Sequence, residues 1–263
     1  MKGLWLRKTG RYKGRRVHSS PGTQEAAIQL LLRHALPRAS VLDLASGGGA
    51  MVARLRDAGF SDLHEVVRDP KVFGEGAADT LAPAADPRDR AAAPQDAASI
   101  PALDFSGNFA DHFSRRFGLV VASEVIEHLE SPRDFLKQAG RLLETDGLLL
   151  LTTPNVSNWV GRVRFFLFGE LRWFDERMYR QARHISPLTD FRMRALLAET
   201  GFELVASTSA GYFYGPLRTL LTAPIALPFV ACFGRRGWGD CNVYLARTSV
   251  RTSRLPGVVS STE

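Results

Sequence analysis

Hydrophobic residues follow two kinds of pattern along this chain. In four segments they recur about every three or four residues, the spacing that places them on one face of a helix. These segments are Gln24–Ala35, Met51–Ala58, Pro132–Leu143 and Leu188–Thr200. Short apolar runs typical of buried strands occur at Val41–Leu44, Leu63–Val67, Ile100–Phe105, Phe117–Ala122, Gly147–Thr153, Phe202–Ser207 and Asn242–Ala246. Strands that alternate with helices predict an α/β fold, in which helices cover both faces of a mostly parallel sheet.

Two segments depart from these patterns. Residues 70–100 consist mainly of Ala, Pro, Asp and Arg. Such a segment cannot bury enough apolar surface to offset the entropy of ordering it, so we predict a flexible insertion. Residues 156–186 are rich in aromatic residues and arginine and fit no simple period. We expect them to form a small cap over the sheet.

The net charge of +7 comes from one end of the chain. Seven of the 34 basic residues precede the first acid, Glu25, and the 27 that follow are balanced by 27 acidic residues. We therefore expect a basic N-terminal arm over residues 1–20, most simply a solvated one. The apolar stretch Gly3–Leu6 is too short for a secretory signal. Two cysteines, Cys232 and Cys241, cannot build a disulfide framework, which favours a cytoplasmic protein.

Residues 217–233 are almost entirely apolar and contain Pro224 and Pro228. A membrane-spanning helix needs roughly 20 apolar residues, so this segment is too short to be one. It is either a buried or substrate-facing element, or a contact with a membrane surface. We favour the first alternative. In the second, the basic arm would strengthen the contact, because each basic residue near an anionic surface contributes about 1 kcal/mol of attraction.

A turn rich in glycine, Ala45-Ser46-Gly47-Gly48-Gly49, follows the predicted strand that contains Asp43. Glycines allow the backbone to approach a ligand closely, and the helix that follows offers free N–H groups. The turn lacks the G-x-G-x-x-G spacing of a dinucleotide site and the Gly-Lys-Ser/Thr ending of a P-loop. Asp43 would repel a phosphate but suits a ligand with an amino group and ribose hydroxyls. Alone, such a turn is equally compatible with a structural role.

Four blocks in order carry a family resemblance. They read VLDLASGGGAMVARL, FGLVVASEVIEHLESP, GLLLLTTPN and HISPLTDFRMRALLAETGFELV. Over roughly residues 20–210 they resemble the class I S-adenosylmethionine-dependent methyltransferases, and more specifically the ubiquinone-biosynthesis O-methyltransferases and related small-molecule enzymes. The resemblance implies a Rossmann-like sheet of seven strands and S-adenosylmethionine as cofactor. The sheet would have helices on both faces and a small substrate cap.

The resemblance also implies the cofactor-binding residues. Asp43 and the turn, with Ala45, Ser46, Gly47 and Gly49, would line the methionine end of the cofactor. Asp104, followed by Phe105, would meet the adenine. Ser123 and Glu124 would lie at the carboxyl end of the fourth strand, where open α/β sheets bind their ligands.

The chain departs from the family pattern at two of these positions. Ala45 replaces the first glycine of the turn, which is tolerable where its φ angle is negative. Val67 occupies the position at which the family places an acid that binds the ribose hydroxyls. Glu65 or Asp69 can replace that acid after a shift in alignment, and we favour Asp69.

Glu124, Glu127 and His128 form an E-x-x-E-H pattern after the fourth predicted strand. If this turn is helical, the three side chains share a face. They could then hold Mg²⁺ or another divalent ion that lowers the pKa of a substrate hydroxyl. Two metal-using branches that this segment resembles share the pattern: the ubiquinone-biosynthesis O-methyltransferases and the small-RNA 3′-terminal 2′-O-methyltransferases. A structural role and metal-free acid–base chemistry remain alternatives.

His184 follows the arginine-rich cap, and the resemblance implies that this stretch folds over the mouth of the active site. His184, with His128, is therefore a candidate general base, because imidazole accepts a hydroxyl proton near neutral pH. His184 is also a candidate fourth metal ligand. The alternative is a histidine that braces a loop.

The aromatic and arginine residues of the cap fit several acceptors. They can stack on nucleic-acid bases, cover an amphiphilic substrate with an acidic group, or form a core of their own. The apolar segment 217–233 favours a small or lipid-like acceptor over nucleic acid.

The sequence thus predicts an enzyme that methylates an oxygen of such a molecule. The alternatives are an RNA-directed, metal-dependent 2′-O-methyltransferase and a non-catalytic scaffold that binds S-adenosylmethionine. The predicted parts are an arm at 1–20, a cofactor-binding core at 21–155, a cap at 156–186, the rest of the sheet at 187–248 and a tail at 249–263.

Overall fold

The computed structural model describes residues 10–34, 37–68, 100–211 and 216–249. Its sheet has the strand order β5-β4-β3-β6-β7-β9-β8. β9 is antiparallel to both of its neighbours, and the other pairs are parallel, so the expected mostly parallel α/β fold is confirmed. The strands are β3 (Val41–Leu44), β4 (Leu63–Arg68), β5 (Ile100–Leu103), β6 (Phe117–Ser123), β7 (Leu143–Pro154), β8 (Phe202–Ala210) and β9 (Cys241–Thr248).

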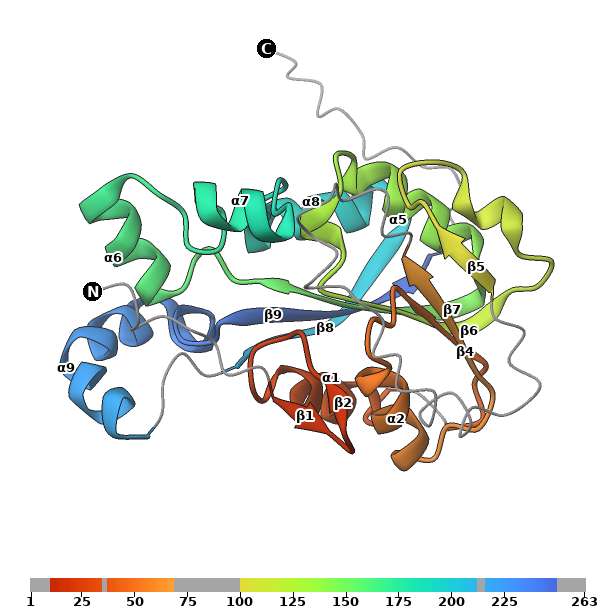
Figure 1. The fold of residues 1–263 in the computed structure, drawn as a ribbon, viewed down its shortest axis with the longest axis horizontal. Coiled ribbons are helices and arrows are strands. Elements are labelled where there is room, and N and C mark those ends of the chain that lie inside the picture. Colours follow the sequence, from red (N-terminus) through yellow and green to blue (C-terminus); the bar gives the residue numbers. More distant parts are fainter. Residues whose placement is uncertain (1–9, 35–36, 69–99, 212–215, 250–263) are drawn as a thin grey trace, which may run out of the picture.

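Helices cover both faces of this sheet (Figure 1), which explains why its central strands carry apolar residues on both faces. α1 (Thr23–Leu31) and α2 (Ala50–Asp57) pack on the face that carries Val41 and Leu119. α5 (Pro132–Arg141) and α8 (Asp190–Glu199) pack on the opposite face, together with the short helix η2 (Phe109–His112). The first strand of the sheet, β3, lies between β4 and β6, so successive strands are added in opposite directions from it. In such sheets the ligand crevice lies where the strand order reverses, at the carboxyl ends of the strands.

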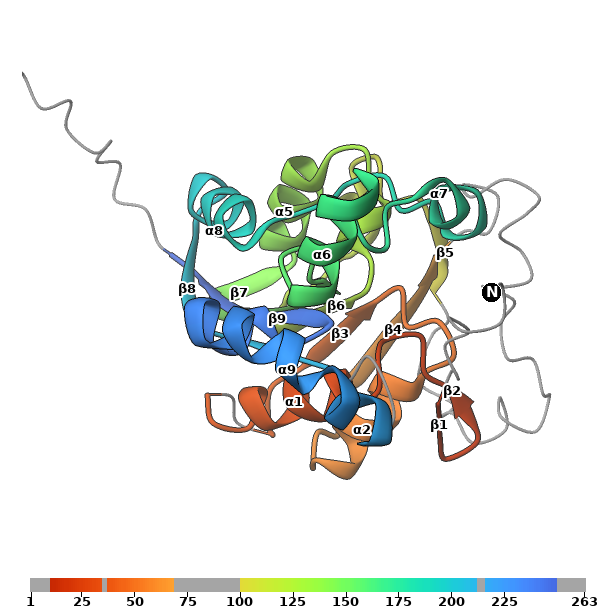
Figure 2. The ribbon, with the colours of Figure 1, turned by 90° about the vertical axis from the view of Figure 1, so that its left-hand side faces the viewer.

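The predicted cap contains two helices, α6 (Trp159–Phe168) and α7 (Glu176–Ala182). The side chains of Asn158 and Asp175 cap their N-termini by accepting hydrogen bonds from backbone N–H groups. α6 packs against α9 (Pro216–Phe233) around Trp159, Val160 and Ala226, and the short helix η4 (Gly234–Gly237) follows α9. Figure 2 looks onto this end of the molecule, where α6 and α9 lie in front of the sheet.

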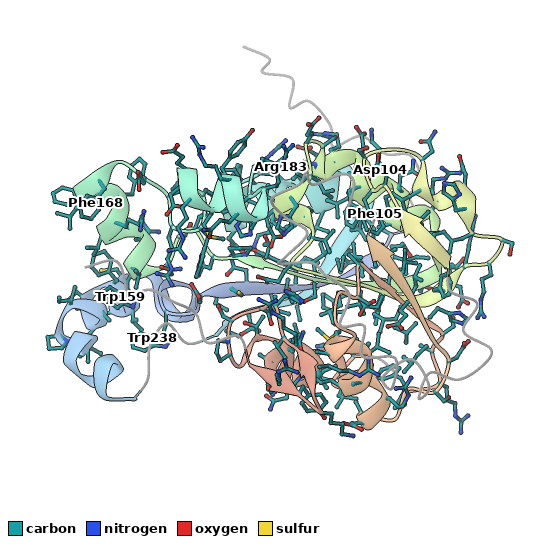
Figure 3. All side chains as sticks on the ribbon, viewed as in Figure 1. Asp104, Phe105, Trp159, Phe168, Arg183 and Trp238 are labelled. Atoms are coloured by element: carbon teal, nitrogen blue, oxygen red, sulfur yellow. The ribbon has the colours of Figure 1, made fainter. Side chains whose placement is uncertain are left out.

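Most aromatic residues of α6 do not form a core for the cap, contrary to one expectation from the sequence. Phe165, Phe166 and Phe168 are 54%, 86% and 70% exposed, and only Trp159 is buried. Figure 3 shows Phe168 at the outer end of the molecule and Trp159 between α6 and α9. Ile225 and Leu227 of α9 are exposed as well. The α6–α9 end therefore presents apolar side chains to solvent.

The N-terminal arm is folded where the structure describes it. Strands β1 (Arg11–Tyr12) and β2 (Arg15–Arg16) form an antiparallel hairpin, so the expectation of a solvated arm is wrong for this part. Its two-residue loop, Lys13-Gly14, has positive φ angles of 48° and 80°, the combination that favours tight hairpins. The hairpin lies beside α2 (Figure 1).

Several predicted features fall outside the described residues: residues 1–9 of the arm, Asp69, all but the last residue of the insertion at 70–100, and residues 250–263. The side chain of Val67 is likewise not described. Among the helices that the structure describes, none combines the length and the apolar character needed to cross a membrane.

Candidate active site

Two adjacent strands, β3 and β6, end side by side at the reversal point of the sheet. Leu44 pairs with Ala122 in their parallel register. β3 leads directly into the glycine turn, and β6 leads into the loop that carries Glu124, Glu127 and His128. The fold therefore brings together the two segments that the sequence singles out most strongly.

The glycine turn is tight, and part of it is strained. The N–H of Ser46 donates to the Val66 carbonyl at 3.0 Å, and that of Gly49 donates to the Ser46 carbonyl at 2.9 Å. Gly47 and Gly49 have φ angles of 56° and 71°, which glycine adopts freely. Ala45 has a φ of 65°, so the negative angle that would make this replacement tolerable is not present. A side chain in the left-handed region costs roughly 1–2 kcal/mol.

Asp43 is the most unusual polar residue of this region. It is 1% exposed, and neither carboxylate oxygen has a hydrogen-bond partner among the described residues. Burial raises the pKa of the Asp43 carboxyl well above its ordinary value, and the Glu65 carboxylate on the neighbouring strand raises it further. Buried carboxylates normally have partners. This one is therefore suited to a ligand that brings hydrogen-bond donors.

Asp104 and Phe105 follow β5. Asp104 is exposed, and its two oxygens accept hydrogen bonds from the N–H and the hydroxyl of Ser106 at 2.8 and 2.7 Å. The ring of Phe105 lies in the core, edge-on to Phe109 with 5.2 Å between ring centroids. Phe105 anchors this loop, and only its backbone is available to line a ligand site. Figure 3 labels both residues at the β5 end of the sheet.

Ser123 and Glu124 both contact β7. The Ser123 hydroxyl lies 2.9 Å from that of Thr152, which donates to the Glu124 carboxylate at 3.0 Å. The Cys241 thiol lies 3.8 Å from the other Glu124 oxygen. Glu124 has a φ of 57°, so no helix runs from Glu124 to His128, and only Ile126–His128 form a turn of 3₁₀ helix, η3. The carboxylate of Glu124 is therefore directed toward β7 and β9.

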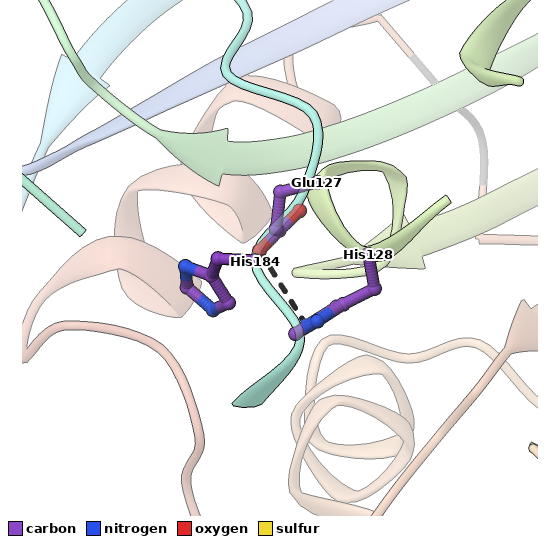
Figure 4. A group of neighbouring side chains, drawn as sticks. All are labelled: Glu127, His128 and His184. Atoms are coloured by element: carbon purple, nitrogen blue, oxygen red, sulfur yellow. Dashed lines mark ion pairs between the residues drawn. The ribbon is translucent and has the colours of Figure 1, made fainter. Parts of the chain in front are cut away.

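Glu127, His128 and His184 come together instead (Figure 4), with one potential ligand atom of each within 4.8 Å of the others. Glu127 is completely buried, and its Oε1 lies 4.0 Å from Nε2 of His128. The rings of His128 and His184 meet edge to face with centroids 4.7 Å apart. The backbone holds the two segments together, because the N–H groups of Ile185 and Ser186 both donate to the Glu127 carbonyl at 3.0 Å.

The hydrogen bond of His184 defines its tautomer. Nδ1 lies 2.8 Å from the carbonyl oxygen of Trp173, and a carbonyl oxygen only accepts. Nδ1 is therefore the donor, and the lone pair of the neutral ring is on Nε2. The Trp173 indole donates to the buried carboxylate of Asp240 at 2.8 Å, and Arg172 donates to the same oxygen at 3.1 Å. Asp240 thus holds the segment that orients His184, a role that the sequence did not indicate.

A cleft of about 520 Å³ lies beside the cap. Its lining is mainly apolar and comes from α6 and the segments before and after it: Val156, Ser157, Gly161, Arg162, Phe165, Phe166 and Leu171. A largely apolar cleft with one cationic side chain suits an amphiphilic molecule.

Sequence reasoning missed two residues at the glycine turn, Arg15 and His18. A Cβ built on Gly49 would lie 2.6 Å from Nη1 of Arg15, and one built on Gly47 would lie 3.3 Å from the His18 ring. The available signal was the Lys13-Gly14 pair between short polar strands. That signal is weak, because Asn-Gly and Asp-Gly are the stronger hairpin markers.

Comparisons with known proteins agree with this geometry. A family model described as a methyltransferase domain matches residues 20–207. A ubiquinone biosynthesis O-methyltransferase of Azorhizobium caulinodans is 31% identical over 106 residues, 39% of either chain. One of Rhizobium rhizogenes is 26% identical over 179 residues, which cover 68% of this chain and 64% of the relative. The matched parts therefore span less than two thirds of these relatives.

Solved structures share the fold. The complex between the Haloferax volcanii Trm112 methyltransferase activator and a methyltransferase contains a chain that matches with a TM-score of 0.56 and 16% identity. The match covers 88% of this chain and 90% of that one. At this identity the likeness shows the fold alone.

Proposed function

The chain belongs to the class I S-adenosylmethionine-dependent methyltransferases, and from this premise we propose that it methylates an oxygen of a small or amphiphilic acceptor. S-adenosylmethionine is the cofactor of the family and supplies a methyl group already activated on a sulfonium. The protein then has two tasks: to position the acceptor hydroxyl and to remove its proton.

His184 carries the proposal. Its Nδ1 donates to the Trp173 carbonyl at 2.8 Å, so the lone pair of the neutral ring is on Nε2, the nitrogen that can accept a proton. The ring lies against His128, and Glu127 lies 4.0 Å from His128. A proton taken up by either histidine would be stabilised by the buried carboxylate of Glu127. We assign His184 as the general base and His128 as its partner, because an imidazole suits a hydroxyl acceptor near neutral pH.

The residues around the glycine turn fit a zwitterionic cofactor. The buried oxygens of Asp43 lack partners among the described residues, and donors on the cofactor would satisfy them. Ala45, Ser46, Gly47 and Gly49 would line the methionine end, and Asp104 with the Phe105 backbone would line the adenine. Ser123 and Glu124 would border both cofactor and acceptor. Asp69 stays our candidate for the ribose, outside the described residues.

A divalent ion at Glu127, His128 and His184 is a second candidate feature. Two imidazole nitrogens and one carboxylate oxygen match the preferences of Zn²⁺, Co²⁺ or Ni²⁺ better than those of Mg²⁺, which favours oxygen ligands. Ligand atoms around a tetrahedral ion are about 3.3 Å apart. The distances between the potential ligand atoms of this group, which reach up to 4.8 Å, would therefore have to shorten. Such an ion would lower the pKa of an acceptor hydroxyl.

The acceptor class rests on the cleft and on the α6–α9 end. The apolar lining suits a hydrocarbon or aromatic moiety, and the Arg162 side chain suits an acidic group. The two curated relatives named above are ubiquinone biosynthesis O-methyltransferases, which favours a similar amphiphile here. We further propose that the exposed side chains of α6 and α9 contact an anionic membrane surface. In the sequence, residues 216–237 contain three arginines and no acid.

Calorimetric titration of S-adenosylmethionine and S-adenosylhomocysteine tests the cofactor site. We expect micromolar binding to the wild-type chain and binding at least about tenfold weaker to Asp43→Asn, because the cofactor amino group loses a charged acceptor. Asp111→Asn removes an exposed carboxylate that pairs with Arg141 and serves as the matched control. Equal affinity in Asp43→Asn and wild type would remove Asp43 from the site.

A second experiment tests the reaction. The wild-type chain, with labelled S-adenosylmethionine, is offered alkylated phenols and catechols, and short RNAs. Methylated phenol is the expected product. Methylated RNA would instead support the nucleic-acid alternative, and tight cofactor binding without any product from either class would support a non-catalytic scaffold.

A further inference from the structure

The N-terminal hairpin lies directly on the glycine turn. A Cβ built on Gly48 would lie 3.0 Å from the carbonyl oxygen of Arg16 and 3.3 Å from its backbone nitrogen. On either side, Gly47 faces the His18 ring and Gly49 faces the Arg15 guanidinium. Three successive glycines are thus covered by one short segment, residues 15–18. Gly48 has no positive φ angle, so this close contact is the reason that a side chain is excluded there.

Contacts with α2 hold the hairpin in this place. The Tyr12 hydroxyl donates to the Asp57 carboxylate, and Nζ of Lys13 lies 2.6 Å from the same carboxylate. Both contacts hold the pKa of Asp57 below its ordinary value. The Arg54 guanidinium stacks on the Tyr12 ring at 3.8 Å from its centroid. Val17, immediately after β2, is buried. The hairpin is therefore packed as a part of the domain.

The Arg15 guanidinium is a cation available at this turn. Its one hydrogen bond within the described residues is a long one, 3.5 Å from Nη1 to the Gly48 carbonyl oxygen, and it forms no ion pair with a described carboxylate. It lies over Gly49, the residue that precedes α2, so the free N–H groups of that helix are adjacent. On the same side of the turn are two acids, the buried Asp43 and Glu65, whose Oε2 would lie 3.6 Å from a Cβ on Gly49.

We propose that the hairpin is a working part of the cofactor site and that Arg15 binds the carboxylate of S-adenosylmethionine. The inference rests on the proposed function, since it concerns the same cofactor. The amino-acid end of S-adenosylmethionine carries one carboxylate and one ammonium group a single carbon apart. A guanidinium binds a carboxylate through two parallel hydrogen bonds, and the N-terminus of α2 adds positive potential. The buried carboxyl of Asp43 then remains for the ammonium group.

Two ligands that differ only in the amino-acid end test this assignment. S-adenosylhomocysteine contains that end, whereas 5′-methylthioadenosine lacks it and retains the adenosine and the thioether. We expect Arg15→Met to weaken the binding of S-adenosylhomocysteine about 10- to 100-fold, the usual effect of losing hydrogen bonds to a charged group. The affinity for 5′-methylthioadenosine should stay unchanged. Arg15→Lys should restore part of the affinity. The measurement is calorimetric titration of the full chain.

Arg11→Met is the matched control, because Arg11 belongs to the same hairpin but its guanidinium binds the Gly14 carbonyl at 2.7 Å, away from the turn. It should bind both ligands as the wild type does. Gly48→Ala adds a steric test, because the new methyl group would push the backbone of Arg16, and with it Arg15, away from the turn. The affinity for S-adenosylhomocysteine should again fall more than the affinity for 5′-methylthioadenosine. Thermal unfolding of each variant checks that the fold is retained.

The outcomes separate this inference from the function on which it rests. If wild type binds neither ligand, both fail. If wild type binds S-adenosylhomocysteine and Arg15→Met binds it equally well, Arg15 has no role and the cofactor site stands. If Arg15→Met weakens both ligands by the same factor, the hairpin is only a structural support and the carboxylate assignment is wrong.

Discussion

The carboxyl ends of β3 and β7 lead into two very different surfaces. After β3 the chain makes a tight turn that buries Asp43 and holds Ala45 in a left-handed conformation, and the N-terminal hairpin covers it. After β7 the chain enters α6, whose outer turns expose Phe165 and Phe166 beside an apolar cleft. The first surface is polar, enclosed and strained, and the second is apolar and open.

This difference matches the two ligands that we propose for the two surfaces. A small zwitterion is recognised by charges held at fixed places, and ligand binding can relieve strain or give unpartnered polar groups a partner. An amphiphile is recognised mainly by apolar contact, which tolerates an open surface. The histidine pair at the end of β6 lies between them, so its loss should affect the reaction more than either binding step.

The largest effect is therefore expected for the general base. His184→Asn keeps a side-chain N–H for the Trp173 carbonyl but has no basic nitrogen. We expect kcat to fall about 10²- to 10⁴-fold while the Kd for S-adenosylhomocysteine changes less than about twofold. Transfer to the best alkylated phenol or catechol and calorimetry measure the two quantities. An undiminished kcat would assign the base to another group, with His128→Asn as the next variant.

Asp43→Asn tests the cofactor side of the comparison. The substitution should weaken cofactor binding and at the same time raise the free energy of unfolding. The folded pKa of Asp43 is raised above the ordinary value of 3.8, so the folded state binds this proton more tightly than the unfolded state does. Asp43 therefore lowers the free energy of unfolding as the pH rises through the window between the two pKa values. The asparagine variant should be more stable than wild type near about pH 7, by on the order of 1–3 kcal/mol.

The difference between the two proteins should shrink towards zero as the pH falls to about 3, where Asp43 is largely protonated in both states. Urea unfolding at about pH 3 and about pH 7 measures it, and the comparison with Asp111→Asn removes general effects of charge. A wild type that is the more stable protein at both pH values would mean that Asp43 has a partner in the folded chain.

Ala45→Gly tests the strain in the same turn. Relief of a left-handed alanine is worth roughly 1–2 kcal/mol, and the added freedom of glycine in the unfolded chain costs about 0.5–1 kcal/mol. The variant should gain about 0.5–1 kcal/mol in the free energy of unfolding. Ala53→Gly, inside α2, is the control of opposite sign and should lose about 1 kcal/mol. Destabilisation by both substitutions would contradict a strained turn at Ala45.

The same contrast explains what could be predicted from the sequence. The sheet, its covering helices and the glycine turn were predictable, because each of these segments buries one face or both and so shows a regular apolar period. β3 and β6 carry apolar residues on both faces, with Val41 and Val121 on one face and Leu42 and Val120 on the other. The grouping of His128 with His184 was expected only from the family resemblance, since 55 residues separate them and backbone hydrogen bonds to Glu127 bring them together.

The outer elements were not predictable for the complementary reason. α6 and α9 expose apolar residues, so their sequence shows no apolar stripe against a polar face. Glu124 was expected beside Glu127, but its left-handed backbone breaks the helical spacing on which that expectation depended. The hairpin is made of polar and charged residues whose partners, such as Asp57, are distant in sequence. Local periodicity carries no information on such contacts.

The smallest effect on stability, and the sharpest test of the exposed surface, is expected for Phe166→Ser. Because Phe166 is 86% exposed, its loss should change the free energy of unfolding by less than about 0.5 kcal/mol. If α6 enters an anionic membrane surface, binding to phosphatidylglycerol vesicles should fall about tenfold, since the ring no longer leaves water. Phe191→Ser on α8 is the matched control, with the same residue type at 80% exposure. Equal vesicle binding by both variants would mean that the α6–α9 end has no membrane role. An increased KM for alkylated acceptors in Phe166→Ser alone would mean that this end binds the acceptor instead.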